Sequence, residues 1–271
     1  MIEAIPGSAG WLRFNRNYGK WFLNDVLHAM ARYRMIGEGD RVAVGLSGGK
    51  DSLALLWLLA YVKQLGLRRF ELTALHVRVV PDQEMTMLRQ VCESLGVPLE
   101  IGDLQRIGPL PEKSRCSLCA RLKRGVLAGL CSQHRINVLA FGHHADDAAE
   151  TLLMNILEVR RLGSFSPRVE VDGPGPVLVR PMVYLREKTI AALVKYLGIP
   201  VPAWPCPFGG GTVRNRYKQA LAGLAAALDK PDLVRRMVAA LENPDQRNFW
   251  SAPTPSLKRD RSVPMRETGK S

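Results

Sequence analysis

Residues 41–56, RVAVGLSGGKDSLALL, place a strand pattern, a glycine turn and a helix pattern in direct succession. Val42, Val44 and Leu46 alternate as in a buried strand, and a leucine-rich helical run begins at Leu53. The segment between them, Ser47-Gly48-Gly49-Lys50-Asp51-Ser52, is here called the phosphate turn. Its glycines let backbone N–H groups approach a ligand closely, the helix N-terminus favours an anion, and Lys50 adds a positive charge. We therefore predict that this turn binds phosphate; the alternative is a glycine-rich turn that binds nothing.

The phosphate turn differs from the common P-loop. A P-loop has four residues between its first Gly and the Gly-Lys pair, and Ser or Thr directly after Lys, whereas Asp51 follows Lys50 here. Ser-Gly-Gly-Lys-Asp-Ser after a first strand instead resembles the pyrophosphate loop (PP-loop) of the adenine-nucleotide α-hydrolase enzymes, which split ATP between its α and β phosphates. The resemblance implies adenylation of a substrate oxygen with release of pyrophosphate.

Strand and helix patterns alternate after the phosphate turn. We expect strands at 70–80, 98–102, 137–141 and 177–180, and helices at 83–95, 147–160 and 187–197. This alternation is typical of an α/β fold with a doubly wound parallel sheet covered on both faces. Ligands of such sheets bind beyond the carboxyl ends of the strands. Residues 163–176, rich in Gly and Pro, are expected to form a loop.

The patterns along the 271 residues predict four parts. They are an N-terminal amphipathic helical extension (1–40), the ATP-binding domain (41–200), a loop with a late cysteine followed by C-terminal helices (201–250), and a disordered basic tail (251–271). An amphipathic helix is expected within 11–36, where aromatic and aliphatic residues alternate with arginines. It either packs on the main domain only or also contacts a nucleic-acid backbone.

The chain is strongly basic, with 38 Lys and Arg against 25 Asp and Glu and a net charge of +13. This excess suits a polyanionic partner such as nucleic acid. No apolar run reaches the roughly 18 residues that span a bilayer, and the N-terminus lacks the pattern of a secretory signal. We expect a cytoplasmic protein with no membrane partner, in which five cysteines favour metal binding or catalysis over disulfides.

A second polar turn, Gly142-His143-His144-Ala145-Asp146-Asp147, follows the apolar strand pattern NVLAF and precedes a helix. Asp146 and Asp147 either cap that helix or hold Mg²⁺ on a triphosphate, because hard cations prefer carboxylate oxygens. A two-metal hydrolase site is a third interpretation, although the other strand ends lack further acidic ligands. The turn also resembles the Gly-His-x-x-Asp-Asp motif of the tRNA-modifying branch of the PP-loop enzymes.

Three thiols are candidate metal ligands. Cys116 and Cys119, spaced as Cys-x-x-Cys, fall on one side of a helical turn, and Cys206 lies in a proline-rich loop. Cys131 is twelve residues beyond Cys119, about 18 Å along a continuous helix, and is too far to share the metal. Cys92 is expected to be a packed core thiol. An iron–sulfur cluster with one open position, a zinc site completed by His134 and a redox disulfide all remain open.

From Val42 to about Tyr217 the chain resembles the tRNA-cytidine 2-sulfurtransferases and their tRNA 2-thiouridine relatives. The matching pieces are LSGGKDS, CSLCARLKRG, FGHHADD, Arg180-Pro181 with the following LREK, and Cys206. The resemblance implies a [4Fe–4S] cluster held by Cys116, Cys119 and Cys206, with its fourth iron free to bind sulfide. It also implies that Lys123 lies near the nucleotide and the cluster.

The resemblance implies ATP-dependent thiolation of a pyrimidine C2 carbonyl in tRNA, with cytidine as the expected target. Ser47, Gly48, Gly49, Lys50 and Ser52 would hold the phosphates. Asp51 with Asp146 or Asp147 would position Mg²⁺, and the adenine would lie near His76 and the backbone at Gly142. Lys50, Lys123 and the metal would stabilise the charge at the α-phosphorus. The cations expected to surround the site are Arg115, Arg121, Lys123, Arg124, Arg160, Arg161 and Arg168.

Some features depart from this pattern. Cytidine enzymes often have a second cysteine where Gly209 stands, and Cys-Pro-Phe looks more like the thiouridine branch. The alternatives are a tRNA 2-thiouridine synthetase, a small-molecule sulfurtransferase of the same class, a tRNA lysidine-type ligase and a non-enzymatic nucleotide-sensing or RNA-binding module. The sulfur donor is expected to be a cysteine desulfurase or free sulfide, and a homodimer is left open.

Overall fold

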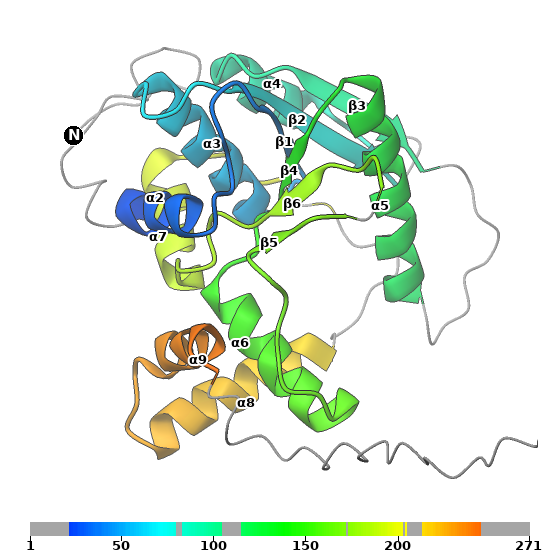
Figure 1. Cartoon of the computed structure of the whole chain (residues 1–271). Coiled ribbons are helices and arrows are strands. Elements are labelled where there is room, and N and C mark those ends of the chain that lie inside the picture. The colour runs from blue at the N-terminus through cyan, green and yellow to red at the C-terminus, as the bar shows by residue number, and fades with distance from the viewer. Residues whose placement is uncertain are drawn as a thin grey trace, which may run out of the picture.

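A computed structural model describes residues 22–79, 83–104, 115–171, 173–202, 204 and 213–244, apart from the side chains of 115–117. Within these residues, six strands form one sheet in the order β3-β2-β1-β4-β6-β5 (Figure 1). The strands are β1 (Arg41–Gly45), β2 (Glu71–Arg78), β3 (Leu99–Asp103), β4 (Val138–Ala140), β5 (Arg168–Val169) and β6 (Val177–Val179). Strand β1 lies inside the sheet, between β2 and β4. Its carboxyl end is therefore flanked by the carboxyl ends of these two parallel strands.

The predicted α/β class and parallel sheet are confirmed for five strands, and β5 corrects the prediction for 163–176. This segment is not entirely loop, because Arg168–Val169 pairs antiparallel with β6. Two residues are too few to give an alternating pattern, and the surrounding Gly and Pro residues hide the pairing. The short strand covers the open edge of β6.

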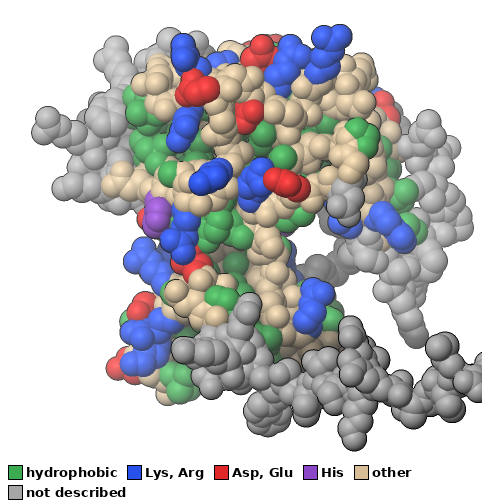
Figure 2. Space-filling model, in the orientation of Figure 1, with side chains coloured by type: hydrophobic (Ala, Val, Ile, Leu, Met, Phe, Trp, Pro, Cys, Tyr) green, Lys and Arg blue, Asp and Glu red, His purple; other side chains and the backbone are tan. Residues whose placement is uncertain are grey.

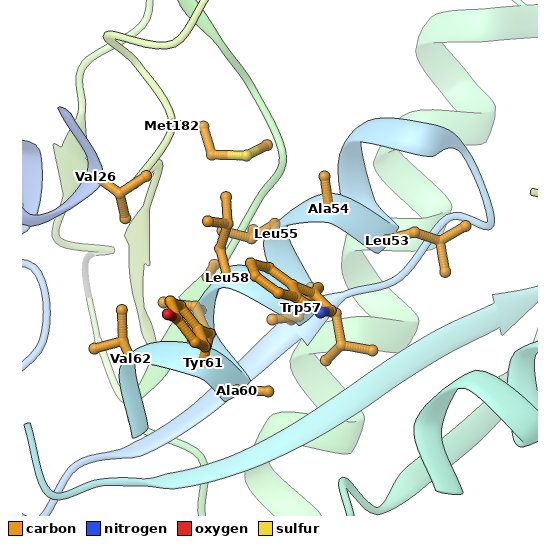
Figure 3. Close-up of a cluster of buried hydrophobic side chains, with 14 of the residues drawn as sticks. Val26, Leu53, Ala54, Leu55, Trp57, Leu58, Ala60, Tyr61, Val62 and Met182 are labelled. Carbon is orange, nitrogen blue, oxygen red and sulfur yellow. The ribbon is translucent and has the colours of Figure 1, made fainter. Parts of the chain in front are cut away.

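Helices α2 (Asn24–Arg32), α3 (Lys50–Gln64), α4 (Thr86–Ser94) and α7 (Glu187–Leu197) supply side chains to the main hydrophobic core on one face of the sheet. Every residue of α3 from Ser52 to Val62 is buried, which explains why its sequence is apolar on all sides. Figure 3 shows Leu55, Leu58 and Tyr61 of α3 directed towards Val26 and Met182. The helix that follows the phosphate turn is therefore a fixed element of the core.

Helix α5 (Arg115–Gln133) covers the opposite face and packs through Leu127 and Cys131. Gly102 of β3 allows this close packing, because a Cβ there would lie 2.6 Å from Val126 of α5. The expected core thiol Cys92 is buried in the main core, and Cys131 is buried under α5. Burial raises the pKa of Cys92 to about 12 and that of Cys131 to about 11, so both stay protonated at neutral pH.

A third layer lies beyond the carboxyl ends of the strands (Figure 1). Helix α6 (Ala145–Met154) continues as the π-helix η3 (Asn155–Val159), and α8 (Val213–Ala227) and α9 (Leu233–Glu242) pack on α6. The helix expected at 147–160 thus begins two residues earlier. It ends where Arg160 adopts a left-handed backbone conformation with φ of 57°.

Helix α2 accounts for the described part of the segment predicted as an amphipathic helix, and its Val26, Ala29 and Met30 are buried. Residues 1–21 and 245–271 lie outside the described residues, so the four-part division remains a prediction. Among the described helices, none is both long and apolar enough to cross a bilayer.

Candidate active site

Hydrogen bonds between side chains and backbone within the phosphate turn fix its conformation. Ser47 Oγ accepts from the Gly49 N–H at 3.2 Å, and Ser52 Oγ accepts from the Ser47 N–H at 3.1 Å and donates to the Gly49 carbonyl at 2.9 Å. Because α3 begins at Lys50, the N–H groups of Lys50, Asp51 and Ser52 have no intrahelical acceptor. The turn therefore directs backbone donors towards a ligand without needing to rearrange.

Two glycines decide how the neighbouring segments pack around this turn. Gly48 has φ of +84°, and a Cβ there would lie 2.5 Å from the ring of Trp204. In the second turn, a Cβ on Gly142 would lie 2.9 Å from the backbone carbonyl of Asp51. The two polar turns predicted from separate strand ends are thus in direct contact.

Lys50 lies between two carboxylates. Its Nζ is 3.0 Å from Asp51 Oδ1 and 2.9 Å from Glu187 Oε1 of α7. Partial burial lowers the pKa of Lys50, but hydrogen bonds to Glu187 and Asp51 outweigh this effect and raise it. Burial alone would raise the pKa of Glu187; bonds from Lys218 and Lys50 instead lower it to about 2. The lysine is therefore charged and already held at the turn.

Glu187 and Lys218 are site residues that sequence reasoning missed. Glu187 belongs to the LREK piece of the family pattern, but nothing in the pattern pairs it with Lys50, 137 residues away. Lys218 of α8 donates to the other oxygen of Glu187. Only the folded arrangement of α3, α7 and α8 brings the three charges together.

The second turn uses its polar residues to join helices. His144 caps α6 by accepting from the Asp147 N–H, and the Asp147 carboxylate accepts from the His144 N–H at 3.0 Å. Asp146 instead accepts from the Glu187 N–H at 2.7 Å and pairs with Arg186 at 2.9 Å, so it fixes the start of α7. The residue that caps α6 is thus His144 and not an aspartate. Asp147 completes the capping box from the third position of the helix, whereas Asp146 binds the start of a different helix, α7.

Arg214 of α8 connects this turn to the third layer. Its guanidinium lies 3.1 Å from Glu150 Oε2 and 3.4 Å from Asp147 Oδ1. Glu150 is only 5% exposed, and burial raises its pKa to about 7 despite the nearby Arg214. Asp147 therefore has two partners, His144 and Arg214, whereas the Asp51 carboxylate hydrogen bonds only to Lys50 within the described residues.

A cavity of about 850 Å³ extends from the phosphate turn to α5. Its walls come from the ends of β1, β2, β4 and β6, from α5 and from Trp204. The polar residues of its lining include Ser47, His76, Lys123, Arg124, His143 and Arg180. Lys123 therefore faces the same space as the phosphate turn. Cys119, one helical turn before Lys123, is buried with 9% exposure.

Two histidines in the cavity wall are neutral at pH 7. Burial lowers the pKa of His76, and its Nδ1 donates to the Leu46 carbonyl at 2.7 Å, which leaves Nε2 as a hydrogen-bond acceptor. Burial, and then the charge of Arg180, lower the pKa of His143 to about 4. The ring of His143 lies between Phe141 and Phe165, at 6.0 and 5.0 Å between centroids.

The cluster ligands are only partly described. Cys119 lies in α5, the side chain of Cys116 is not described, and Cys206 lies outside the described residues. In the described part of the chain, no group of three or more His, Cys, Asp or Glu side chains is arranged to hold a metal ion. The three-thiol site therefore stays a prediction.

The basic residues expected around the site differ in their surroundings. Lys123 and Arg124 line the cavity, whereas Arg121, Arg160 and Arg161 are exposed, and Arg168 lies on β5 paired with Glu170. Figure 2 shows Lys and Arg side chains both on the sheet-bearing body and on the α6–α8–α9 layer. Positively charged side chains are thus present outside the cavity as well.

Comparisons with known proteins show which family the chain belongs to. A family model described as a PP-loop domain matches residues 22–202. The tRNA-cytidine(32) 2-sulfurtransferase of Pelobacter propionicus is 37% identical over 229 residues, which cover 82% of this chain and 84% of that protein. The protein of the same name from Geobacter metallireducens is 35% identical over 83% of this chain and 90% of its own length.

Two solved structures share the fold. The U34-tRNA thiolase NcsA from Methanococcus maripaludis, solved with its [4Fe-4S] cluster, has a TM-score of 0.64 at 23% identity, over 82% of this chain and 78% of its own. The NMN synthetase from Francisella tularensis has a TM-score of 0.50 at 18% identity, over 88% of this chain and 100% of its own. Because the PP-loop model spans most of the chain and the sequence relatives align over most of both lengths, the chain belongs to the PP-loop enzymes and, within them, to the tRNA-cytidine(32) 2-sulfurtransferase family.

Proposed function

We propose that this protein replaces the C2 oxygen of a cytidine in tRNA with sulfur, at the expense of ATP. The observation that carries the proposal is the single cavity that joins Ser47 of the phosphate turn to Lys123 of α5, one helical turn after Cys119. A nucleotide-binding turn and a thiol-bearing helix that share one cavity suit an enzyme that activates a base and then delivers sulfur to it. The names of the sequence relatives support the same reaction.

ATP is assigned to the phosphate turn and the adjoining cavity wall. The N–H groups at the start of α3 and the Lys50 ammonium bind the phosphates, and the neutral Nε2 of His76 accepts a hydrogen bond from the adenine amino group. Gly142 keeps the second turn close to the start of α3. The nucleotide then spans the carboxyl ends of β1 and β2.

Magnesium is assigned to Asp51 and Asp147, whose carboxylates both approach the same atom of His144, at 3.8 and 3.5 Å from its Nε2. Both oxygen donors suit a hard cation. Asp146 is a weaker candidate than the sequence suggested because its partners are closer. The Glu187 N–H and Arg186 lie 2.7 and 2.9 Å from its oxygens, whereas the His144 N–H and Arg214 lie 3.0 and 3.4 Å from those of Asp147. Magnesium would neutralise charge on the triphosphate at this edge of the sheet.

In the first step, the cytidine O2 attacks the α-phosphorus and pyrophosphate leaves. Negative charge grows on the phosphate oxygens during this attack, and Lys50 stabilises it from the turn while Lys123 does so from α5. The step converts the C2 oxygen into part of AMP, which is a good leaving group. Sulfur can then take its place.

The residues around Cys119 fit a sulfur-bearing group. Cys119 is buried in the first turns of α5, and Lys123 and Arg124 next to it would balance the negative charge of thiolates and sulfide. With Cys116 and Cys206, Cys119 would hold a [4Fe–4S] cluster, which when bound supplies the sulfide that displaces AMP from C2. A cysteine desulfurase or free sulfide is the proposed source of the sulfur.

The tRNA target is assigned to a single-stranded loop, because a base must leave its stack to enter the cavity. Lys123 and Arg124 at the wall and the exposed Arg160 and Arg161 would contact the phosphate backbone. Contacts that do not depend on sequence would then lie at the cavity wall and at exposed positions outside it, and the interior of the cavity would recognise the base.

The experiment is nucleoside mass spectrometry of tRNA from cells with and without this protein, complemented with the wild type or with Lys50→Ala. We expect 2-thiocytidine to disappear without the protein and to return only with the wild type. Loss of 2-thiouridine instead would identify the other branch of the family as the activity, and unchanged tRNA would point to a small-molecule acceptor.

Iron provides a second experiment on the same proposal. Anaerobically purified protein is expected to contain iron and acid-labile sulfide in equal amounts, about four of each per chain. Cys116→Ala, Cys119→Ala or Cys206→Ala should remove both, whereas the buried Cys131 offers a matched control in Cys131→Ala. Colourless wild-type protein that contains zinc would contradict the cluster.

A further inference from the structure

Glu187 brings two lysines from distant parts of the chain to one carboxylate. Lys50 of α3 donates to its Oε1 at 2.9 Å, and Lys218 of α8 donates to its Oε2. The Glu187 carboxylate therefore bridges the two ammonium groups. Glu187 thus holds Lys218 near Lys50, the lysine of the phosphate turn.

The charges around Lys50 show why one lysine is insufficient for a polyanion. Lys50 alone faces the carboxylates of Asp51 and Glu187, so one positive charge stands against two negative ones. Lys218 brings this group to neutrality. A triphosphate or pyrophosphate that reaches the turn would be repelled by Glu187 unless a second cation were also present.

The position of Lys218 suits direct contact with phosphate. Its side chain is 54% exposed, so the ammonium can turn from Glu187 to a ligand without being pulled out of a packed core. Arg214, one turn earlier on α8, is bound to Glu150 and Asp147 and fixes the helix against the second turn. The helix backbone thus stays in place while the lysine moves.

We propose that Lys218 is a second phosphate-binding lysine. When ATP binds, the Lys218 ammonium releases the Glu187 carboxylate and binds the β- and γ-phosphates together with Lys50. After cleavage the same two lysines bind the pyrophosphate. In the ligand-free protein, the Glu187 carboxylate accepts hydrogen bonds from both lysines and so keeps them close together. The inference rests on the proposed function, because it takes the phosphate turn as the ATP site.

The test is calorimetric titration with inorganic pyrophosphate and Mg²⁺, using the full-length protein. Lys218→Gln should weaken pyrophosphate binding about tenfold, since a charge-assisted hydrogen bond is lost. Arg216→Gln removes the same charge from an exposed position on the same helix and should change binding by less than about twofold. Lys218→Arg should retain most of the affinity.

A double variant separates direct binding from simple neutralisation of Glu187. If Lys218 binds pyrophosphate, Glu187→Gln/Lys218→Gln should bind about tenfold more weakly than Glu187→Gln alone. If Lys218 only neutralises Glu187, the two variants should bind equally, and this equality would overturn the inference. Unfolding temperatures of all variants check that α8 remains docked.

Lys50→Ala distinguishes failure of this inference from failure of the proposed function. If Lys50→Ala weakens pyrophosphate binding but Lys218→Gln does not, the second lysine is rejected and the phosphate turn stands. If Lys50→Ala also binds as the wild type does, the phosphate turn is not the ATP site and both proposals fail.

Discussion

At the scale of single residues, the site depends on a few side chains that are very small or unusually placed. Gly142 lets two backbone segments touch, and Gly48 makes room for Trp204. The sequence indicates that glycines are needed in the phosphate turn, because Gly-Gly-Lys precedes a helix. It does not reveal what each glycine touches, since Trp204 and Asp51 reach them only through the fold.

Gly142→Ala should disturb the phosphate turn. The added Cβ would lie 2.9 Å from the Asp51 carbonyl group, and backbone cannot move aside as a flexible side chain could. We expect a loss of about 1–3 kcal/mol in the free energy of unfolding, together with weaker ATP binding, measured by denaturation and titration.

The control is Gly129→Ala in α5, where a Cβ would meet nothing within 4 Å. Because alanine favours a helix over glycine, this variant should gain up to about 1 kcal/mol. Equal behaviour of the two variants would contradict the close contact between the turns.

His143 should make stability depend on pH below neutrality. Its pKa of about 4 in the folded protein lies below the usual value of about 6.5, so the unfolded chain binds more protons between these values. The stabilising contribution of neutral His143 is complete above about pH 6.5 and is lost as the pH falls towards 4. As the pH falls through this window, the free energy of unfolding should decrease less steeply for His143→Gln than for the wild type.

Parallel slopes for the two proteins would mean that His143 titrates normally and is not enclosed. The wild-type comparison is essential because carboxylates such as Glu187, with a pKa of about 2, also lose their stabilising ionised form in acid. Only the difference between the two curves belongs to His143.

At the scale of helices and strands, most of the fold follows from sequence periodicity. The alternating patterns predict β1 to β4, β6 and the helices on both faces, and the leucine run predicts that α3 lies in the core. The sequence does not predict β5, because two residues are too few to show an alternating pattern. Helix α6 begins two residues before the predicted start, because His144, rather than an aspartate, is its N-cap. Local patterns give the elements, but capping partners and short edge pairs depend on neighbours distant in sequence.

Leu58→Ala should be strongly destabilising. The side chain is fully buried in α3, between the sheet and the helices that cover it (Figure 3). Its removal leaves a cavity, and we expect a loss of about 2–5 kcal/mol in the free energy of unfolding by chemical denaturation. Leu67→Ala, at a position 47% exposed, should change stability by less than about 0.5 kcal/mol.

A small effect of Leu58→Ala, comparable to that of Leu67→Ala, would show that α3 is not enclosed on all sides. The phosphate turn would then lack the rigid support that its geometry implies. The measurement therefore tests the element on which the site is built.

At the scale of the whole molecule, the chain joins the phosphate turn, a thiol-bearing helix and exposed basic residues. Sequence motifs identify the first two and the net charge of +13 predicts the third. They do not predict the network that links Lys50, Glu187 and Lys218, because its members come from three helices. Ion pairs across such distances have no signature in one sequence.

Binding of tRNA should depend steeply on salt. Each phosphate contact releases counterions, so affinity should fall by about a hundredfold or more between about 50 and about 200 mM salt in filter-binding assays. Arg160→Gln/Arg161→Gln, at exposed positions after η3, should reduce the slope of log affinity against log salt by about one for each lost contact.

The matched control is Arg68→Gln/Arg69→Gln, an adjacent pair just before β2, at the opposite end of the strands from the cavity. This double variant removes the same charge and should leave the slope unchanged. If both pairs reduced the slope equally, tRNA would be attracted by net charge alone and not by a defined surface.

The central claim is that one cavity couples ATP cleavage to thiolation of a cytidine. The most direct measurement counts pyrophosphate and 2-thiocytidine in one anaerobic reaction that contains the protein, tRNA, ATP, Mg²⁺ and sulfide. The account predicts equal amounts of both products from the wild type and neither from Lys50→Ala. Formation of 2-thiocytidine without matching pyrophosphate, or its formation by Lys50→Ala, would contradict it.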